Sequence, residues 1–174
     1  MKKLKKFLKY ALVCACLLAA LLSCGCARNK HIVVRSVWEG DFCCSVYEDG
    51  TAEIIAYRGQ EESLTIPEKI GKYKVVGFGP KAFDGAVGLR QAAVPDTVTK
   101  LPAKLFNGCP DLEAVYIPVS VKTIGKNLVY NCPNFTKVMY AGTEAEWKAV
   151  NVGSAPWTDN YVLINAEIQY GVRP

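Results

Sequence analysis

The sequence is poor in the residues from which catalytic and metal-binding sites are built. It has one histidine, His31, and none of its 8 cysteines forms a pair separated by two residues. Zinc-type sites need several such ligands at short spacings. The acidic residues considered for catalysis are scattered or lie at an expected helix cap: Asp41, Glu61, Glu62, Glu144 and Glu146. Catalysis needs a nucleophile with a base, paired carboxylates or a metal cluster, so we expect neither an enzyme nor a bound metal or cofactor.

Acidic residues are absent from the whole N-terminal stretch before Glu39, whereas five lysines lie in its first ten residues. Without residues 1–23, the count falls from 21 to 16 basic residues, which balance the 16 acidic ones. A neutral body lacks the clustered Lys and Arg side chains of a nucleic-acid-binding surface. We therefore expect no nucleic-acid partner.

The N-terminal apolar run is too short to span a membrane. It extends from Tyr10 to Leu22 and has 13 residues, whereas a spanning helix needs about 20. A basic stretch, KKLKKFLK, precedes the run and small residues follow it. This order is typical of a signal peptide, which we predict over residues 1–23.

The residues that follow sharpen this prediction. Leu21-Leu22-Ser23-Cys24 resembles a bacterial lipobox, which has an aliphatic residue three positions before a cysteine and a small residue just before it. The resemblance implies a diacylglyceryl lipid on the Cys24 thiol, cleavage before Cys24 and a lipid-anchored chain on the extracytoplasmic face of a bacterial membrane. Cys26 is the alternative acceptor, and a plain secretory signal is the other interpretation. Two acyl chains would make the anchoring stable.

An internal repeat with a period of 23 is the strongest signal in the rest of the chain. Residues 89–111 and 112–134 have equal length and share Leu, Pro, Val, Leu, Cys and Pro at the same offsets. The numbers of Ile66 and Val94 differ by 28 rather than 23, so the earlier copy at Ile66-Pro67 carries about five extra residues near GKYKV. Four columns keep the period over three copies: Leu89, Leu112 and Phe135; Phe78, Leu101 and Ile124; Ala82, Leu105 and Leu128; Phe83, Phe106 and Val129.

Each copy has the pattern of a short strand that ends at a proline. Its alternating apolar residues are typical of a half-buried strand, and proline cannot continue the hydrogen-bond ladder of a sheet. A polar turn, a second apolar cluster and a Gly or Asn with Cys-Pro follow. One such unit cannot bury its own apolar side, whereas several stacked units share a continuous core.

These features resemble the BspA-type leucine-rich repeats of bacterial surface proteins, over roughly residues 63–142. The resemblance implies a mostly β solenoid, right-handed and with short helices and turns, of about 3–4 coils that each correspond to one period of the sequence. It also implies adhesion to host proteins, extracellular matrix or other cells. The matching elements are the Ile-Pro strand ends, Ile124-Gly125, Ala82-Phe83 with the variant Leu105-Phe106, and Asn131-Cys132-Pro133-Asn134-Phe135.

Atypical segments on both sides of the repeats predict caps. In residues 41–62, Asp49-Gly50 between two apolar runs predicts a hairpin with a type I′ turn, and residues 24–40 are expected to be a tether. In residues 143–174, Thr143 to Glu146 is a capping box that starts a helix to about Val150. Trp147 on that helix would seal the end, and a strand pair, Tyr161–Ile164 with Ala166–Tyr170, would complete this cap.

Five cysteines remain beyond the proposed anchor, an odd number that excludes a complete disulfide framework within one chain. Cys109 and Cys132 occupy the same place in adjacent copies, where they are either small buried thiols or a disulfide between coils. Cys43 and Cys44 would point to opposite faces of a strand, which predicts that one of them is buried. A link from the exposed one to Cys26 is the alternative to free thiols.

The outward face of the strands is the candidate binding surface. Within residues 112–117, Leu112, Val115 and Ile117 would point inward, which turns Ala114 and Tyr116 outward. An exposed Tyr beside an exposed Met has the composition of a contact surface, although β-propensity alone also favours a Tyr there. The two predicted columns are Thr65, Ala93, Tyr116 and Met139, and Ser63, Gln91, Ala114 and Lys137.

The sequence thus favours a membrane-anchored cell-surface lipoprotein whose repeats recognise a protein or glycan ligand. The alternative is a structural envelope lipoprotein that docks on a protein or cell-wall polymer of the same cell. The two hypotheses differ in where the partner resides. A short array offers a small contact area, so we expect weak binding in either case.

Overall fold

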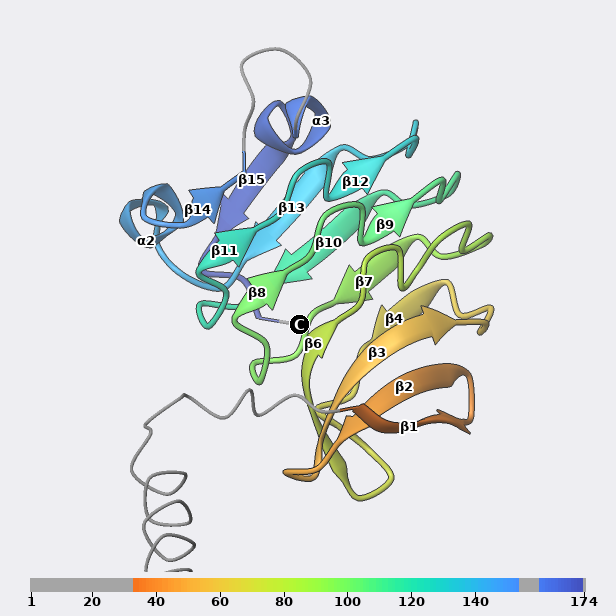
Figure 1. Cartoon of the computed structure of the whole chain (residues 1–174). Coiled ribbons are helices and arrows are strands. Elements are labelled where there is room, and N and C mark those ends of the chain that lie inside the picture. The colour runs from red at the N-terminus through yellow and green to blue at the C-terminus, as the bar shows by residue number, and fades with distance from the viewer. Residues whose placement is uncertain (1–32, 154–159, 174) are drawn as a thin grey trace, which may run out of the picture. The chain divides into compact units, whose positions relative to one another are not determined.

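Short strands arranged in successive coils make up most of the chain in the computed structural model, which describes residues 33–153 and 160–173 (Figure 1). Two short helices, α2 (Glu144–Lys148) and α3 (Tyr161–Ile164), belong to this part. The expected mostly β fold is confirmed. The expected signal peptide over residues 1–23, together with Cys24, Cys26 and His31, lies outside the described residues. Within those residues, every helix is too short or too polar to cross a membrane.

The largest sheet of the coils is parallel and stacks one strand per repeat. Its register advances by one repeat at a time, so that Ala114 pairs with Gln91 on one side and with Lys137 on the other. The edge strand from the C-terminal cap adds to the sheet in the same direction. In spatial order the strands are β15 (Glu167–Tyr170), β13 (Lys137–Tyr140), β10 (Ala114–Ile117), β7 (Gln91–Ala93) and β4 (Ser63–Thr65).

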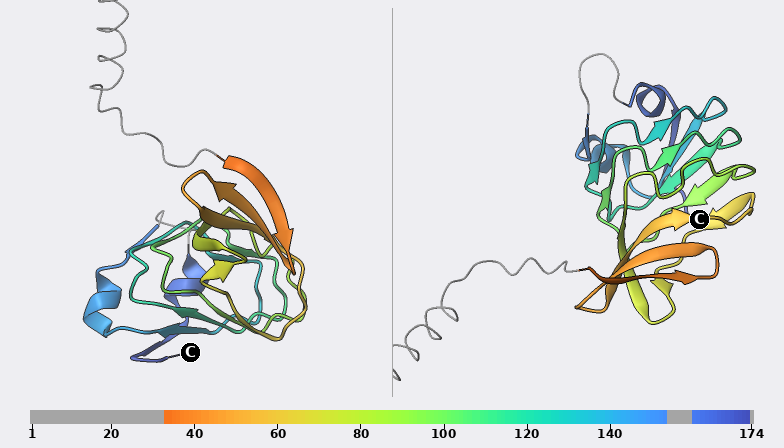
Figure 2. Two further views of the ribbon diagram at one scale, coloured as in Figure 1. Left: turned by 90° about the horizontal axis from the view of Figure 1, so that it is seen from below. Right: turned by 45° about the vertical axis from the view of Figure 1, so that its right-hand side comes forward.

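Two smaller parallel sheets complete the coils. Each fully formed coil contributes one short strand to each of the three sheets, and Figure 2 shows from below how successive coils overlie one another around one interior. One sheet has the order β14 (Asn151–Val152), β11 (Thr123–Ile124) and β8 (Lys100–Leu101). The other pairs β12 (Val129–Tyr130) with β9 (Phe106–Asn107).

Two corners of each coil require a positive φ angle. Glycine adopts this conformation freely and asparagine tolerates it, whereas it is uncommon for lysine. The period of the sequence therefore reappears in the backbone angles. The first corner is Lys81, Lys104 and Asn127, with φ of 60°, 56° and 53°; the second is Gly85, Gly108 and Asn131, with φ of 65°, 64° and 53°.

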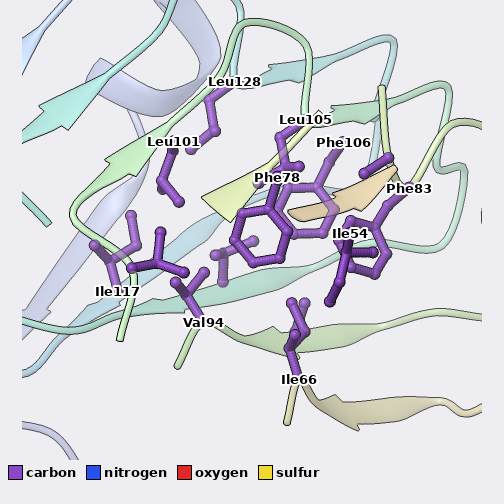
Figure 3. Close-up of a cluster of buried hydrophobic side chains, with 14 of the residues drawn as sticks. Ile54, Ile66, Phe78, Phe83, Val94, Leu101, Leu105, Phe106, Ile117 and Leu128 are labelled. Carbon is purple, nitrogen blue, oxygen red and sulfur yellow. The ribbon is translucent and has the colours of Figure 1, made fainter. Parts of the chain in front are cut away.

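The predicted apolar columns form the core. Phe83 and Phe106, which are equivalent residues of adjacent coils, stack with ring centroids 5.2 Å apart, and Phe78 meets Phe83 edge-on at 5.9 Å. Figure 3 shows these rings beside Leu105 and Ile54, all directed into the same interior. The members of all four columns are buried. Repeated burial at equivalent positions is what makes one core out of separate coils.

A five-stranded sheet covers the N-terminal end of the coils. The expected hairpin is present, but its loop has three residues, of which only Gly50 has a positive φ, 79°. This geometry fits a three-residue hairpin loop with a left-handed glycine, so the expected type I′ turn is not formed. The strands are β1 (Val33–Glu39), β2 (Phe42–Tyr47), β3 (Thr51–Tyr57), β6 (Tyr73–Phe78) and β5 (Lys69–Ile70), in this order.

Two segments of this cap differ from the expected organisation. Strand β1, from the second half of the expected tether 24–40, pairs with β2, and its Val37 packs on the core. The extra residues of the first repeat form the antiparallel hairpin β5–β6, and β6 then runs parallel to β3. The first coil is thereby joined to the cap by a continuous sheet.

The C-terminal cap begins as expected. Thr143 caps α2, its hydroxyl accepts from the Glu146 backbone N–H, and the Glu146 carboxylate accepts from the Thr143 backbone N–H at 2.8 Å. Trp147 packs on the core and its ring meets Tyr140 edge-on, with centroids 5.1 Å apart. The capping box and the position of Trp147 are confirmed.

The expected strand pair at the end of the chain is half wrong. Residues 161–164 form helix α3, and only β15 is a strand, which pairs with β13 rather than with its neighbour in sequence. A run of four apolar residues does not distinguish a strand from a helical turn. Only Leu163 of this run is buried, and a single helical turn is enough to direct one side chain inward while β15 takes the sheet edge.

Candidate functional site

The register of the parallel sheet places the predicted binding residues in two adjacent columns. Tyr116 lies between Ala93 and Met139, and Thr65 continues this column on the edge strand β4. Ala114 lies between Gln91 and Lys137, and Ser63 continues the second column. Strand β15 extends both columns with Gln169 and Glu167. These two residues carry no repeat signal, since β15 belongs to the cap.

The exposure of the columns differs from the expected one. Thr65 and Gln91 are exposed and Met139 is half-buried, but Tyr116 is only 6% exposed and Ala114 only 4%. Strand β10 is the middle strand of the sheet, so its side chains have neighbours on both sides. The expected exposed Tyr-Met patch is therefore not formed, because the bulk of the Tyr116 side chain is covered.

The first column opens into a groove at the ends of strands β4, β7 and β10. The groove has a volume of about 640 Å³. The two prolines that end the strands, Pro67 and Pro95, lie in its wall, so that the strand-end signal of the sequence becomes part of a surface. The groove is lined by Thr65, Ile66, Pro67, Glu68, Ala93, Val94, Pro95, Asp96, Tyr116, Val119, Ala141 and Arg173.

The rim of the groove carries charges of both signs. Asp96 and Glu68 are exposed acids that follow the strand ends, and Arg173 reaches the groove from the C-terminal segment. A turn at Gly171, with φ 69°, brings this segment back, and the Val172 backbone N–H donates to the Tyr140 carbonyl at 3.2 Å. Arg173 lies outside the repeats, so no periodic pattern predicts its place here.

Tyr116 offers a hydroxyl to the groove. Burial raises its pKa, the carboxylate of Asp96 raises it further, and the guanidinium of Arg173 opposes these effects. The hydroxyl therefore stays protonated at neutral pH. It forms no hydrogen bond with the residues that the structure describes. A protonated, unpaired hydroxyl beside a carboxylate and a guanidinium can hydrogen-bond to a ligand.

The described cysteines are structural. Cys43, Cys44, Cys109 and Cys132 are all free and buried, whereas only one of Cys43 and Cys44 was expected to be buried. The Cys109 Sγ donates to the Phe83 carbonyl at 3.0 Å, and the equivalent Cys132 Sγ donates to the Phe106 carbonyl at 3.5 Å. The neighbouring Cys132 thiol and burial raise the pKa of the Cys109 thiol.

Apolar walls and a rim with charges of both signs characterise the groove. Within residues 33–153 and 160–173, His, Cys, Asp and Glu side chains form no group of three that could hold a metal ion. The acids considered for catalysis are not gathered either: Asp41 faces Arg58 in the N-terminal cap, and Glu144 and Glu146 belong to α2. Apolar walls with a few polar groups at the rim match the composition of recognition sites.

Comparisons with known proteins agree with this fold. The model of the BspA type leucine rich repeat region matches residues 60–147, in 6 copies. A leucine-rich repeat protein from Bacteroides capillosus has a similar structure, with a TM-score of 0.60 and 20% identity, over 77% of this chain and 98% of that one.

A leucine rich cell surface protein from Faecalibacterium prausnitzii A2-165 is similar with a TM-score of 0.53 and 28% identity, over 64% of this chain. The chain spans only 33% of the length of that protein. No curated protein matches the chain. The family match covers half of the chain and coincides with the coils described above, so the chain belongs to the family of BspA-type leucine-rich repeat proteins.

Proposed function

We propose that this chain is a lipid-anchored cell-surface protein that recognises a protein or glycan ligand, and so acts in adhesion. The observation that carries the proposal is the groove at the strand ends, where the unpaired Tyr116 hydroxyl lies with Asp96 and Arg173. The similar protein from Faecalibacterium prausnitzii A2-165 is a cell surface protein, which supports the location. The function needs no catalytic step and no cofactor.

The groove favours an extended segment with both polar and apolar groups. Its walls offer the exposed Val119 and the half-buried Pro67 and Ala93 for apolar contact, while its rim offers a carboxylate and a guanidinium. An extended peptide or a glycan chain can present both polar and apolar groups along its length to such a groove. The small area predicts weak, saturable binding unless several copies engage together.

The anchoring part of the proposal rests on the lipobox-like residues before Cys24. Labelled lipid is expected to enter the wild-type chain and to be lost in Cys24→Ala. Incorporation that persists until Cys26 is also changed would move the anchor to Cys26. A chain that takes up no label would contradict lipid anchoring and leave the plain secretory interpretation.

The recognition part is tested with the mature chain on a panel of extracellular-matrix proteins, mucins, glycans and cell-wall polymers. Tyr116→Phe removes one hydroxyl, and Asp96→Asn with Arg173→Gln removes the two rim charges. Each loss is expected to weaken saturable binding about tenfold or more, because hydrogen bonds to charged groups are worth about 1.5–3 kcal/mol. The matched control is Tyr161→Phe, which alters a tyrosine that is 72% exposed on α3.

Binding that is indifferent to the groove variants would contradict the assignment of the groove. Binding of a cell-wall polymer alone, lost in the same variants, would keep the groove but favour docking within the cell's own envelope over adhesion. Thermal melts of all variants are needed, and we expect them to stay close to that of the wild type.

A further inference from the structure

The extra residues of the first repeat place like charges against each other. Lys69 and Lys74 are direct partners in the antiparallel ladder of hairpin β5–β6, and Lys72 lies in its turn. Like charges at opposite positions of an antiparallel pair destabilise it. Later coils lack this hairpin. The insertion therefore destabilises its own hairpin. This cost points to a role of its lysines in contact with another molecule rather than in the stability of the fold.

Strand β1 brings a fourth cation to the same place. The Arg35 Nη2 donates to the Tyr73 hydroxyl at 2.5 Å, and the Arg35 guanidinium carbon lies 5.9 Å from the centroid of the Tyr73 ring. The Lys72 Nζ lies 5.4 Å from the same centroid. Two cations thus converge on one ring. We define the basic patch as Arg35, Lys69, Lys72 and Lys74.

The basic patch is available to a partner. All four of its residues are exposed, and none of them forms an ion pair within the part of the chain that the structure describes. The Glu39 carboxylate also reaches this turn, where a Cβ added to Gly71 would lie 3.4 Å from its Oε2. Glu68 directly precedes the hairpin. Four cations against these two acids leave the region positively charged.

The chain leading to β1 places this region close to the proposed anchor. Only residues 25–32 separate Cys24 from Val33. Fully extended, this stretch spans at most about 30 Å. Strand β1 also exposes two apolar side chains directly before Arg35, since Val33 is 51% and Val34 59% exposed. A positive region with exposed valines, held near a bilayer, has the composition of a membrane-surface contact.

We propose that the basic patch docks on the anionic headgroups of the membrane that holds the lipid anchor. The proposal rests on the proposed lipidation of Cys24. A short tether alone would leave the coils free to rotate, whereas a second contact would fix their orientation relative to the membrane. Each Lys or Arg near an anionic surface strengthens association about fivefold. The attraction decays over about 8 Å at physiological ionic strength, so the patch must touch the headgroups.

The test uses the lipidated chain reconstituted in two kinds of vesicle, phosphatidylcholine alone and phosphatidylcholine with phosphatidylglycerol. An amine-reactive reagent and mass spectrometry report the accessibility of each lysine. We expect the labelling of Lys69, Lys72 and Lys74 to fall about fivefold or more in the anionic vesicles, and to recover in high salt. Lys148 on α2 is the internal control, because its side chain is 72% exposed and its labelling should be equal in both vesicles.

A charge-matched pair of variants separates a local contact from net charge. In the anionic vesicles, the amide hydrogens of β1 should exchange more slowly than in the neutral ones. The hairpin triple variant should lose this protection, whereas the control triple should keep it. The hairpin triple is Lys69→Gln with Lys72→Gln and Lys74→Gln; the control triple is Lys100→Gln with Lys122→Gln and Lys148→Gln.

Equal lysine labelling in the two kinds of vesicle would overturn the proposal, as would protection of β1 that survives in the hairpin triple. Protection of the hairpin by an anionic cell-wall polymer, but not by anionic vesicles, would overturn the membrane as partner and assign the patch to the polymer. Lipid incorporation is measured on the same sample. A chain without lipid contradicts the proposed anchoring, whereas a lipidated chain without the footprint contradicts only the docking.

Discussion

Asn160 closes the hydrogen-bond ladder at the C-terminal end of the coils, and its replacement is the sharpest test of how the solenoid is capped. Between inner coils, backbone groups find partners in the next coil, as where the Phe106 N–H donates to the Leu128 carbonyl at 2.9 Å. Leu128 belongs to the last such coil. Its own N–H donates to the Asn160 Oδ1 at 2.8 Å, so a side chain of the C-terminal cap satisfies a buried backbone group at this end of the coils.

The same side chain satisfies two further backbone groups. The Asn160 Nδ2 donates to the Gly125 carbonyl at 2.9 Å and to the Gly153 carbonyl at 2.6 Å. Asn160 is 1% exposed and has a φ of 61°, a conformation that asparagine tolerates better than most residues. One residue therefore combines a left-handed backbone with three side-chain hydrogen bonds to backbone groups.

We expect Asn160→Ala to lower the free energy of unfolding by about 3–5 kcal/mol. Each buried polar group left without a partner costs about 1–3 kcal/mol, and a left-handed alanine adds about 1–2 kcal/mol. Water that enters the end of the coils would recover part of the sum. At about 2–4 °C for each kcal/mol, the melting temperature should fall by roughly 6–20 °C.

Thermal and urea unfolding measure the loss of stability. Two further variants separate the contribution of the left-handed backbone from that of the side-chain hydrogen bonds. Asn160→Gly keeps the left-handed backbone and should be less destabilising than Asn160→Ala by about 1 kcal/mol. Asn165→Ala is the matched control, because its Nδ2 makes one exposed bond to the Tyr161 carbonyl, and it should cost less than about 1 kcal/mol. If Asn160→Ala and Asn160→Gly both stay as stable as Asn165→Ala, the capping role of Asn160 is refuted.

Three further predictions concern the coils and α2. Phe83→Ala should cost about 3–5 kcal/mol in urea unfolding, since the ring is fully buried and stacks on Phe106, and a loss under 1 kcal/mol would contradict the aromatic core. Lys81→Gly should raise the melting temperature slightly, because Lys81 has a φ of 60° and glycine adopts this conformation without steric cost; a decrease would show that the lost side chain matters more. The hydrogen bond from the Thr143 backbone N–H holds the pKa of Glu146 below its ordinary 4.5, so its stabilisation is present above pH 4.5 and lost as the pH falls through the lowered value. Glu146→Gln should therefore be less stable than the wild type at pH 7 and differ less from it below that lowered value, and a difference that does not change with pH would contradict the linkage.

The architecture was predictable from the sequence because it repeats. The regular spacing of the copies sets the register of the parallel sheet, and equivalent residues such as Leu89 and Leu112 become buried together. The capping box at Thr143 was equally predictable from the sequence, since its hydrogen bonds join residues three positions apart. In each case the interaction is local, or it is made long-range by repetition, so a short pattern contains the information.

The sequence by itself therefore determined the stacked coils, their register and the columns of side chains on the strand face. Only the tertiary structure decided that Tyr116 is covered, that Arg173 returns to the groove, and that Asn160 closes the ladder. The physical reason is that these residues act across long separations in the chain and occur once each. A position that is neither repeated nor part of a local motif becomes recognisable only when the fold brings its partners to it.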